Sequence, residues 1–353
     1  MRARNYGRDG GWSLAASPKG LIENPEHPGA GAPSDVLSSV LNSIRLSGSL
    51  QFCFMPTGVW QTPGRIPLPG TRTTMMPFHI LVAGTCWMTA GDRKWDLHEG
   101  DVVALPFDGG HMLGAGSGGR VVSPRHDLPP KPWLQPPVLR YGDDGPGVRL
   151  LCGYLQCDAL SFRPLQAALP PVLHVRTRGS NTSPWLRAAI EQMTAEVDTP
   201  RSGGLSMLER LTEVVFIELL RHQIIAAKSE SAGWLAALTD RSLGQCLALI
   251  HEHPKREWTV QDLAASSGLS RSVLTERFQT VLDTSPMRYV RDWRLCLAGV
   301  ALSTTKKSIA AIADETGYGT EAAFNRAFSR TYGVPPATWR QNAKRDPFAP
   351  PPA

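Results

Sequence analysis

The stretches Gly317–Arg340, GYGTEAAFNRAFSRTYGVPPATWR, and Gly268–Arg291, GLSRSVLTERFQTVLDTSPMRYVR, are two copies of one pattern. Each opens on glycine, the residue that most readily adopts the left-handed backbone of a tight turn after a helix. Two apolar residues four positions apart follow, so they share one face of the next helix. They are Leu274 and Phe278 in the first copy, Phe324 and Phe328 in the second. The pattern predicts a turn and then a helix, twice.

A short apolar segment precedes each glycine, VQDLAASS in the first copy and SIAAIADET in the second. Thr259 with Asp262 forms a predicted N-terminal cap for the first segment, and Ser308 a cap for the second. Helix, tight turn, helix is the helix-turn-helix arrangement, whose second helix enters the major groove of DNA. We therefore predict two such units, at residues 259–281 and 308–332.

A single helix is predicted to join the two units, because apolar residues recur at helical spacing from Met287 to Leu302. A plain helical bundle with similar turns is the alternative, since glycine turns and paired phenylalanines also serve ordinary packing. Two copies in register, joined by one helix, favour the DNA-binding interpretation.

The region from about Leu243 to Arg340 resembles the DNA-binding domain of AraC/XylS-type transcription regulators, and the second copy is close to the signature of that family. The resemblance implies a DNA-binding domain over residues 236–345. It also implies a set of side chains that face DNA: Arg271, Ser272, Thr275 and Glu276 in the first unit, and Thr320, Glu321, Ala322, Asn325 and Arg326 in the second.

The chemistry of this set suits base recognition, because arginine pairs with guanine, asparagine with adenine, and threonine offers a methyl group or a hydroxyl. Glu276 and Glu321 fit less well beside phosphates, and surface solubility is the alternative role for both. Four further basic residues are candidates for phosphate contacts, with a solvated surface charge as the alternative: Lys306, Lys307, Arg291 and Arg330.

The front of the chain has a different pattern, with short β-type runs separated by Gly, Pro and Asp. We predict an α+β protein of two domains, with a cupin-like antiparallel β-barrel in front and an all-α domain with two helix-turn-helix motifs behind. The predicted ranges are a flexible tail at 1–33, an effector or oligomerisation domain at 34–175, and a helical linker or dimerisation element at 176–235.

The segment Gly100–His111, GDVVALPFDGGH, resembles the second motif of cupin barrels, with one inner glycine displaced by Asp108. This likeness favours a ligand pocket, for which His79, Trp87 and His111 are the candidate effector-binding residues, with ordinary core packing as the alternative for Trp87. A metal-dependent cupin needs several converging ligands, and no HxH pair occurs in this half. No metal and no cofactor are therefore expected.

Composition limits the class of protein. The formal net charge is +6, and from Asp240 to Asp346 fifteen lysines and arginines face eleven acidic residues, a modest excess that permits DNA contact. The six cysteines are dispersed in apolar runs, which favours reduced thiols and a cytoplasmic location. The apolar runs are too short to cross a bilayer, so no membrane partner is expected. His251 and His253 are expected on the surface at a helix end.

These patterns predict a sequence-specific DNA-binding transcription regulator, modulated by a small-molecule effector, and not an enzyme. The predicted partner is double-stranded promoter DNA, with RNA polymerase and a second copy of the chain as further candidates. The alternative is a cupin-fold metal-dependent enzyme fused to a helical domain.

Overall fold

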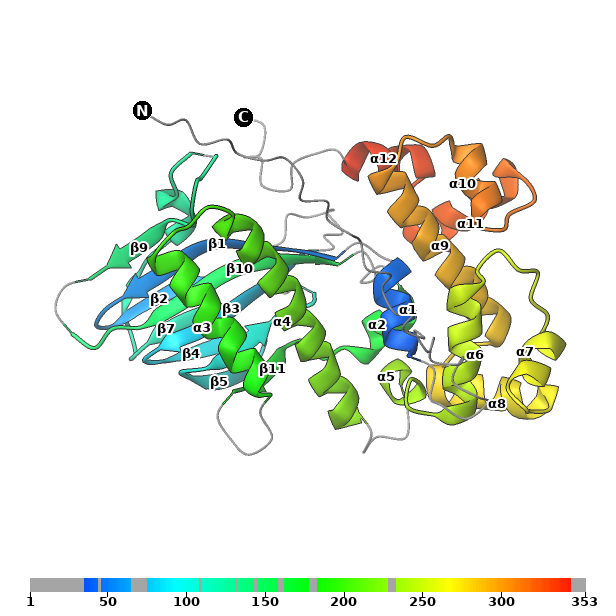
Figure 1. The fold of residues 1–353 in the computed structure, drawn as a ribbon, viewed down its shortest axis with the longest axis horizontal. Helices are drawn as coiled ribbons and strands as arrows, with labels where there is room; N and C mark the ends of the chain where they lie inside the picture. The colour runs from blue at the N-terminus through cyan, green and yellow to red at the C-terminus, as the bar shows by residue number, and fades with distance from the viewer. Residues whose placement is uncertain are drawn as a thin grey trace, which may run out of the picture. The chain divides into compact units, whose positions relative to one another are not determined.

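The computed structural model describes residues 35–43, 46–64, 75–107, 110–130, 132–142, 145–157, 162–177, 183–227 and 233–343 (Figure 1). The predicted tail at 1–33 lies outside these residues. In the described front part the strands are β1 (Leu46–Pro56), β2 (Trp60–Pro63), β3 (Met75–Ala83), β4 (Thr85–Ala90), β5 (Arg93–His98), β6 (Asp101–Ala104), β7 (Met112–Ala115), β8 (Arg120–Val121), β9 (Val138–Tyr141), β10 (Arg149–Cys157) and β11 (Leu173–Arg176).

These strands form two sheets, one of six strands in the order β11-β6-β3-β10-β1-β9 and one of five in the order β5-β4-β7-β2-β8. Neighbouring strands are antiparallel except for the parallel pairs β1 with β9 and β2 with β8. The predicted cupin-like β-domain is confirmed. Its strands make two separate sheets instead of one closed barrel.

The six-stranded sheet is buried on both faces, because residues of β3 belong to two different hydrophobic clusters. Phe78 and Ile80 belong to a first hydrophobic cluster, which the sheet shares with the helices. Leu81 belongs to a second cluster, together with Met88 and Leu113 of the five-stranded sheet. Because successive side chains of a strand point to opposite faces, one strand supplies both clusters.

Two helices cover the outer face of the six-stranded sheet, α3 (Pro184–Asp198) and α4 (Gly204–Ala227), and both lie within the range 176–235 that was predicted to be helical (Figure 1). Helix α4 packs along β1. A Cβ atom at Gly48 of β1 would lie 2.5 Å from the Thr212 side chain, so the close approach of helix and strand requires glycine there.

The other helices are α1 (Val36–Ser43), α2 (Arg163–Ala168), α5 (Trp234–Ala237), α6 (Arg241–Glu252), α7 (Val260–Ser266), α8 (Arg271–Leu282), α9 (Pro286–Thr304), α10 (Ile309–Glu315), α11 (Glu321–Tyr332) and α12 (Pro336–Ala343), with a short 3-10 turn at Pro124–Asp127. Helix α1 precedes the first strand in sequence and packs on α6. The first cluster accordingly continues from the sheet through α1 and α5 to α8 and α9.

A third hydrophobic cluster lies apart, formed by the second half of α9 with α10, α11 and α12. In Figure 1, α9 runs from the helices α6–α8 to the helices α10–α12. It is the predicted joining helix, and its residues divide between two clusters: Tyr289, Val290 and Trp293 belong to the first, Leu295, Ala298 and Leu302 to the third.

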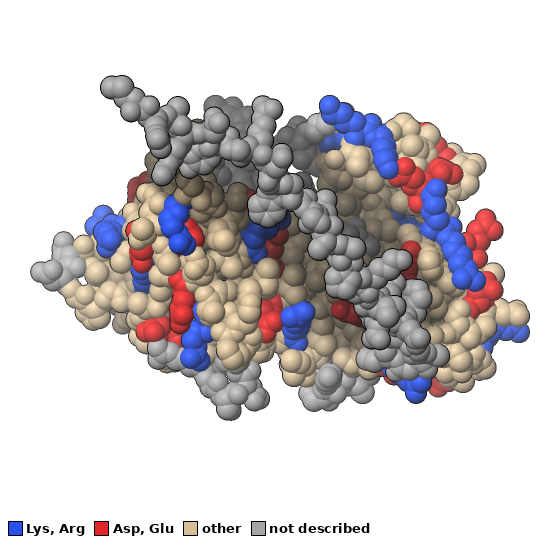
Figure 2. Space-filling model, viewed as in Figure 1, with Lys and Arg blue, Asp and Glu red and all other residues tan. Residues whose placement is uncertain are grey.

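Charged side chains of both signs share the face of the molecule shown in Figure 2. On the face shown in Figure 2, lysines and arginines are interspersed with acidic residues and do not gather in one basic patch. No helix among the described residues is long and apolar enough to span a membrane.

Candidate nucleic-acid interface and effector site

The first helix-turn-helix unit consists of α7, a tight turn and α8. Thr259 and Asp262 form a reciprocal capping box at the start of α7, as predicted. Gly268 in the turn has a φ of 66°, in the left-handed region that glycine adopts most readily. Leu274 and Phe278 of α8 are fully buried, so the opposite face of α8 is available to a partner.

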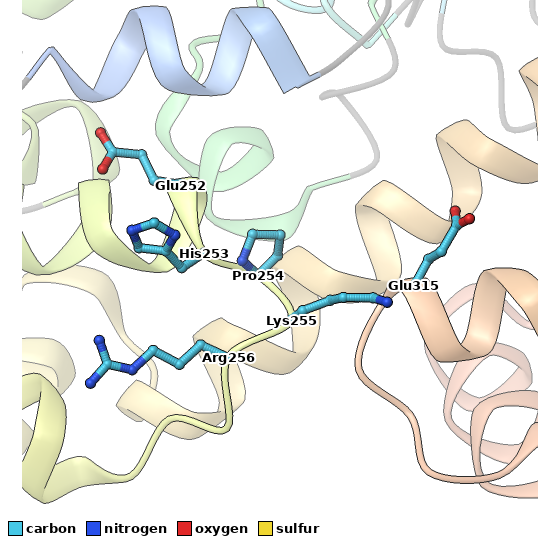
Figure 3. A pocket seen from close by; sticks show the side chains of 6 residues that line it. All are labelled: Glu252, His253, Pro254, Lys255, Arg256 and Glu315. Atoms are coloured by element: carbon cyan, nitrogen blue, oxygen red, sulfur yellow. The ribbon is translucent and has the colours of Figure 1, made fainter.

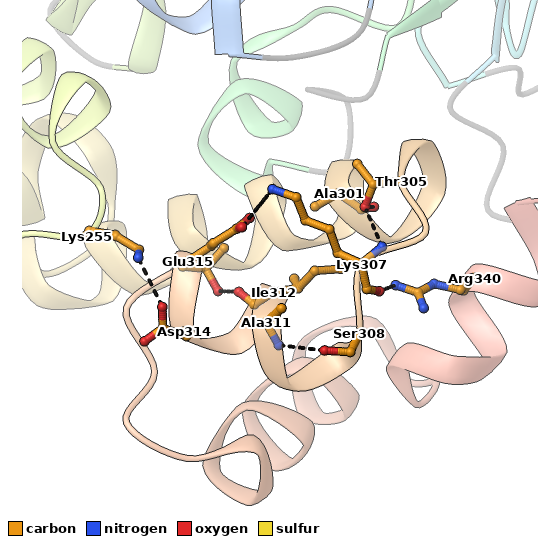
Figure 4. A network of polar contacts seen from close by, with 11 residues as sticks. Lys255, Ala301, Thr305, Lys307, Ser308, Ala311, Ile312, Asp314, Glu315 and Arg340 are labelled. Carbon is orange, nitrogen blue, oxygen red and sulfur yellow. Dashed lines mark hydrogen bonds and ion pairs between the residues drawn. The ribbon is translucent and has the colours of Figure 1, made fainter.

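The second unit repeats these features with α10, a turn and α11. Ser308 accepts a hydrogen bond from the Ala311 amide at the start of α10 (Figure 4), and Gly317 has a φ of 80°. Phe324 and Phe328 are fully buried. Both helix-turn-helix units are therefore present, and the same face of each second helix is turned away from its core.

Most predicted base-reading side chains lie on these outward faces. Arg271, Ser272, Thr275 and Glu276 are exposed on α8, and Glu321, Ala322 and Arg326 on α11, with Asn325 half-buried. One residue of the same face was missed, Gln279. It is exposed four positions after Thr275, so the helical period extended by one turn would have found it.

Several of the predicted DNA-binding residues already have partners within the chain. The Thr320 hydroxyl accepts a hydrogen bond from the Ala323 amide and so caps α11. Glu321 stands in the first turn of α11, where a negative charge interacts favourably with the helix dipole. These contacts support structural roles beside any contact with DNA.

The four candidates for phosphate contacts also differ in whether their side chains pair with an acidic residue of the chain. Lys307 donates hydrogen bonds to both carboxylate oxygens of Glu315 at 2.7 Å (Figure 4). Arg291 donates a hydrogen bond to Asp292 at 3.1 Å. Lys306 and Arg330 are exposed. Among the described residues no ion pair involves Arg271, Arg326 or Arg330, which leaves these three guanidinium groups available to DNA.

The seam between the two units is held by polar contacts. The loop between α6 and α7 faces α10 across a pocket of about 570 Å³ lined by Glu252, His253, Pro254, Lys255, Arg256 and Glu315 (Figure 3). Lys255 reaches from this loop to Asp314 of α10, with 3.1 Å between the charged atoms (Figure 4). From α9, Arg294 donates hydrogen bonds to backbone carbonyl groups of both units.

The three predicted effector-binding residues do not lie together at one site. His79 of β3 and His111, which precedes β7, join the two sheets, with 2.8 Å between their Nε2 atoms. Trp87 lies on β4 between the buried Cys86 and Met88, so strand alternation turns it to the outer face. There its indole N–H donates to the Gly116 carbonyl oxygen at 2.8 Å. The structure thus separates Trp87 from the histidine pair.

Both histidines are buried, and His79 is uncharged near pH 7. Burial, with a smaller contribution from the neighbouring His111, lowers the pKa of His79 well below its usual value. The other ring nitrogen of His79 lies 3.1 Å from the Cys152 sulfur, on the side away from His111. These three side chains therefore do not converge on one point, and the described residues contain no group of three or more His, Cys, Asp or Glu side chains placed to hold a metal ion.

An aromatic cluster connects the β-domain to the first unit. Phe162, just before α2, is fully buried against Tyr289 and Trp293 of α9, with 5.3 Å between ring centroids in both cases. It also contacts Trp234 and His251. The expectation that His251 lies on the surface is wrong, because its side chain is 2% exposed, and only His253 is exposed.

His251 is held within this cluster by stacking and by one hydrogen bond. Its ring lies 4.3 Å from the Trp293 ring, and its Nε2 is 2.8 Å from the Tyr289 hydroxyl. The indole N–H of Trp234 donates to the same hydroxyl at 2.8 Å. Burial lowers the pKa of His251 to about 3, so the ring is neutral near pH 7.

Comparison with known proteins agrees with this architecture. Residues 35–224 match the family described as Cupin, and residues 263–342 match the helix-turn-helix domain family. An uncharacterized HTH-type transcriptional regulator of Haemophilus influenzae is 30% identical over 312 residues, covering 87% of this chain and 99% of that protein. A putative AraC-like transcription regulator of Streptomyces antibioticus is 30% identical over 264 residues, covering 74% of this chain and 80% of that protein.

Among solved structures, ToxT from Vibrio cholerae O395 aligns with 86% of this chain and 99% of its own, at 11% identity and a TM-score of 0.36. The cupin match covers more than half of the chain, and the two bacterial relatives match most of their own lengths. The chain therefore belongs to the AraC-like family of DNA-binding transcription regulators, with a cupin domain in front of its paired helix-turn-helix units.

Proposed function

We propose that the two units bind successive major-groove segments on one face of a promoter, so that a single chain reads an asymmetric two-part site. The observation that carries this proposal is the repeated unit on one helix: α8 and α11 each expose the face opposite a buried apolar pair, and α9 joins them. Such half-sites lie about one helical turn apart, roughly 34 Å.

Within each unit, Arg271 and Arg326 are the proposed readers of guanine, with Asn325 as a reader of adenine. Arg330 and Lys306 are the proposed phosphate contacts. Lys307 and Arg291 are weaker candidates for this role, because each is already ion-paired within the chain.

Selection from a randomised duplex library with the full chain, at two salt concentrations, tests the proposal. We expect a two-part sequence motif and an affinity that falls steeply as salt rises. Arg326→Ala should cost about 1–3 kcal/mol and relax preference at one base pair. Arg330→Ala, one turn further along the same helix, is the matched control and should weaken all sequences alike. Absence of any enriched sequence would refute the proposal.

We further propose that a small molecule bound in the cupin domain modulates DNA binding, and that the helices α3 and α4 carry the coupling or a contact with a second copy. The support is the buried His79–His111 pair between the two sheets and the aromatic cluster that joins this domain to the first unit. RNA polymerase is the proposed further partner, and the cytoplasm, where the DNA lies, is the proposed location. All six cysteines are buried free thiols, which fits a reducing compartment.

We also propose that the chain is not an enzyme. The relatives are named as transcription regulators, and the two histidines lack a third converging side chain among the described residues. Metal analysis of the purified protein tests this: stoichiometric metal that is lost on His79→Ala, together with a turnover, would favour the cupin-enzyme alternative.

A further inference from the structure

The two helix-turn-helix units share a helix without sharing a core. The residues of α9 from Tyr289 to Cys296 contribute to the first hydrophobic cluster, and those from Leu295 to Leu302 contribute to the third. Arg294 lies at the overlap of the two clusters, between Trp293 of the first and Leu295 of the third. A contact at this point acts on both units at once.

The guanidinium group of Arg294 donates hydrogen bonds to the loop that precedes the first unit and to the turn of the second. Its Nε donates to the Pro254 carbonyl oxygen at 2.7 Å and its Nη2 to that of Arg256 at 2.8 Å, both in the loop that leads into α7. Its Nη1 donates to the Gly317 carbonyl oxygen at 3.3 Å, in the turn between α10 and α11. Because the guanidinium is a rigid planar fork, it fixes the two loops relative to each other.

The turn glycine of the second unit is adapted to this contact. A Cβ atom at Gly317 would lie 2.9 Å from Cζ of Arg294. At Gly268, the equivalent turn residue of the first unit, a Cβ would meet nothing within 4 Å. Both residues have a positive φ, so the difference between them is the guanidinium packed on Gly317.

The other polar contact across the seam is weaker. Lys255 and Asp314 form an ion pair whose side chains are 55% and 81% exposed, and exposed pairs of this kind contribute little. A pocket of about 570 Å³ lies between the α6–α7 loop and α10 (Figure 3). Arg294 is therefore the contact best placed to hold the angle between the units.

We propose that Arg294 is a positioning residue that sets the relative orientation of α8 and α11, and with it the spacing between the two half-sites that the protein accepts. The inference rests on the proposed two-part reading of DNA and adds the residue that determines its geometry. Arg294 itself does not have to touch DNA for this role.

The test compares the duplex selected by the wild-type full chain with the same duplex carrying one extra base pair between its half-sites. One base pair displaces the second half-site by about 3.4 Å and rotates it by roughly 34°. A rigid reader should lose roughly 10-fold or more in affinity, because the second binding event depends on a matched geometry. Arg294→Gln should bind the original duplex more weakly and lose less than about 3-fold on insertion.

The ratio of the affinity for the original duplex to the affinity for the duplex with one extra base pair distinguishes a positioning role of Arg294 from an effect on protein stability. A variant that is merely destabilised has a smaller active fraction for every duplex, so its ratio stays at the wild-type value. Arg294→Lys keeps the charge without the planar fork and should behave like Arg294→Gln. Arg288→Gln is the matched control on the same helix: its side chain is 52% exposed and pairs with Asp292 at 3.9 Å, so its ratio should equal that of the wild type.

If Arg294→Gln does not fold, Gly317→Ala replaces it as the test variant and Gly268→Ala serves as its control. Gly317→Ala should lower the affinity ratio, and Gly268→Ala should leave it at the wild-type value. A wild-type ratio in Arg294→Gln or Gly317→Ala overturns the inference and leaves the proposed function standing. A wild-type selection that yields no duplex, or a single half-site, removes the two-part reading and this inference with it.

Discussion

Replacing His251 with phenylalanine should remove a large part of the protein's sensitivity to mild acid. In the unfolded chain a histidine takes up a proton below about pH 6.5. In the folded protein burial lowers the pKa of His251 to about 3, so the buried ring stays neutral. The unfolded state then binds more protons than the folded state between these two values, and the free energy of unfolding falls as the pH decreases through that window.

The magnitude follows from the two pKa values. Between pH 7 and pH 5, His251 alone should lower the free energy of unfolding by about 2 kcal/mol. His79, whose pKa is also lowered, acts in the same direction. The comparison between wild type and His251→Phe isolates the contribution of His251, since His79 is present in both.

Phenylalanine keeps an aromatic ring against Trp293 and Tyr289 and cannot take up a proton. It leaves the Tyr289 hydroxyl without its histidine partner, which should cost about 1–3 kcal/mol at both pH values and so cancels in the difference. Urea unfolding at pH 7 and pH 5, followed by tryptophan fluorescence and circular dichroism, measures that difference.

His253→Gln is the matched control, because His253 lies two residues away and is exposed. Its loss of stability between pH 7 and pH 5 should equal that of the wild type. An equal loss in His251→Phe and the wild type would refute the assignment of His251 as a buried neutral group.

Three further predictions concern packing and turns, each measured by urea unfolding of the full chain. Phe162→Ala should cost about 3–5 kcal/mol, because it empties the centre of the aromatic cluster; a loss below about 1 kcal/mol would contradict that role. Gly268→Ala should cost about 1–2 kcal/mol from its positive φ, and Gly317→Ala more, because its Cβ also meets the guanidinium; equal costs would count against the close contact. Thr259→Ala should cost about 1 kcal/mol by breaking the capping box with Asp262, and an unchanged stability would show that the cap is dispensable.

The repeated unit could be predicted from the sequence because its signals are local. A turn glycine, a cap residue and an apolar pair four positions apart all lie within one short stretch, so Gly268, Thr259 and Phe278 are recognised without knowledge of their neighbours. The joining helix and the pair α3 and α4 follow from the same helical periodicity.

Features that depend on distant partners could not be predicted. By its sequence context His251 is expected on the surface beside the exposed His253. Its burial comes from contacts with Phe162, Tyr289 and Trp293, all distant in the chain. The outward direction of Trp87 depends on which face of its strand meets the other sheet. Arg294 donates to backbone carbonyl groups, and every residue type carries such a group, so residue identity does not indicate these partners.

The separate third cluster affects the order in which the parts of the protein unfold. The helices α10, α11 and α12 share their hydrophobic cluster with the second half of α9, whereas α7 and α8 belong to the cluster that extends into the β-domain. Regions with their own small core open at lower free energy than the whole molecule. Under heat or proteolysis the second unit should therefore be lost first, and the regulator would become a reader of half a site, still folded but much less selective among promoters.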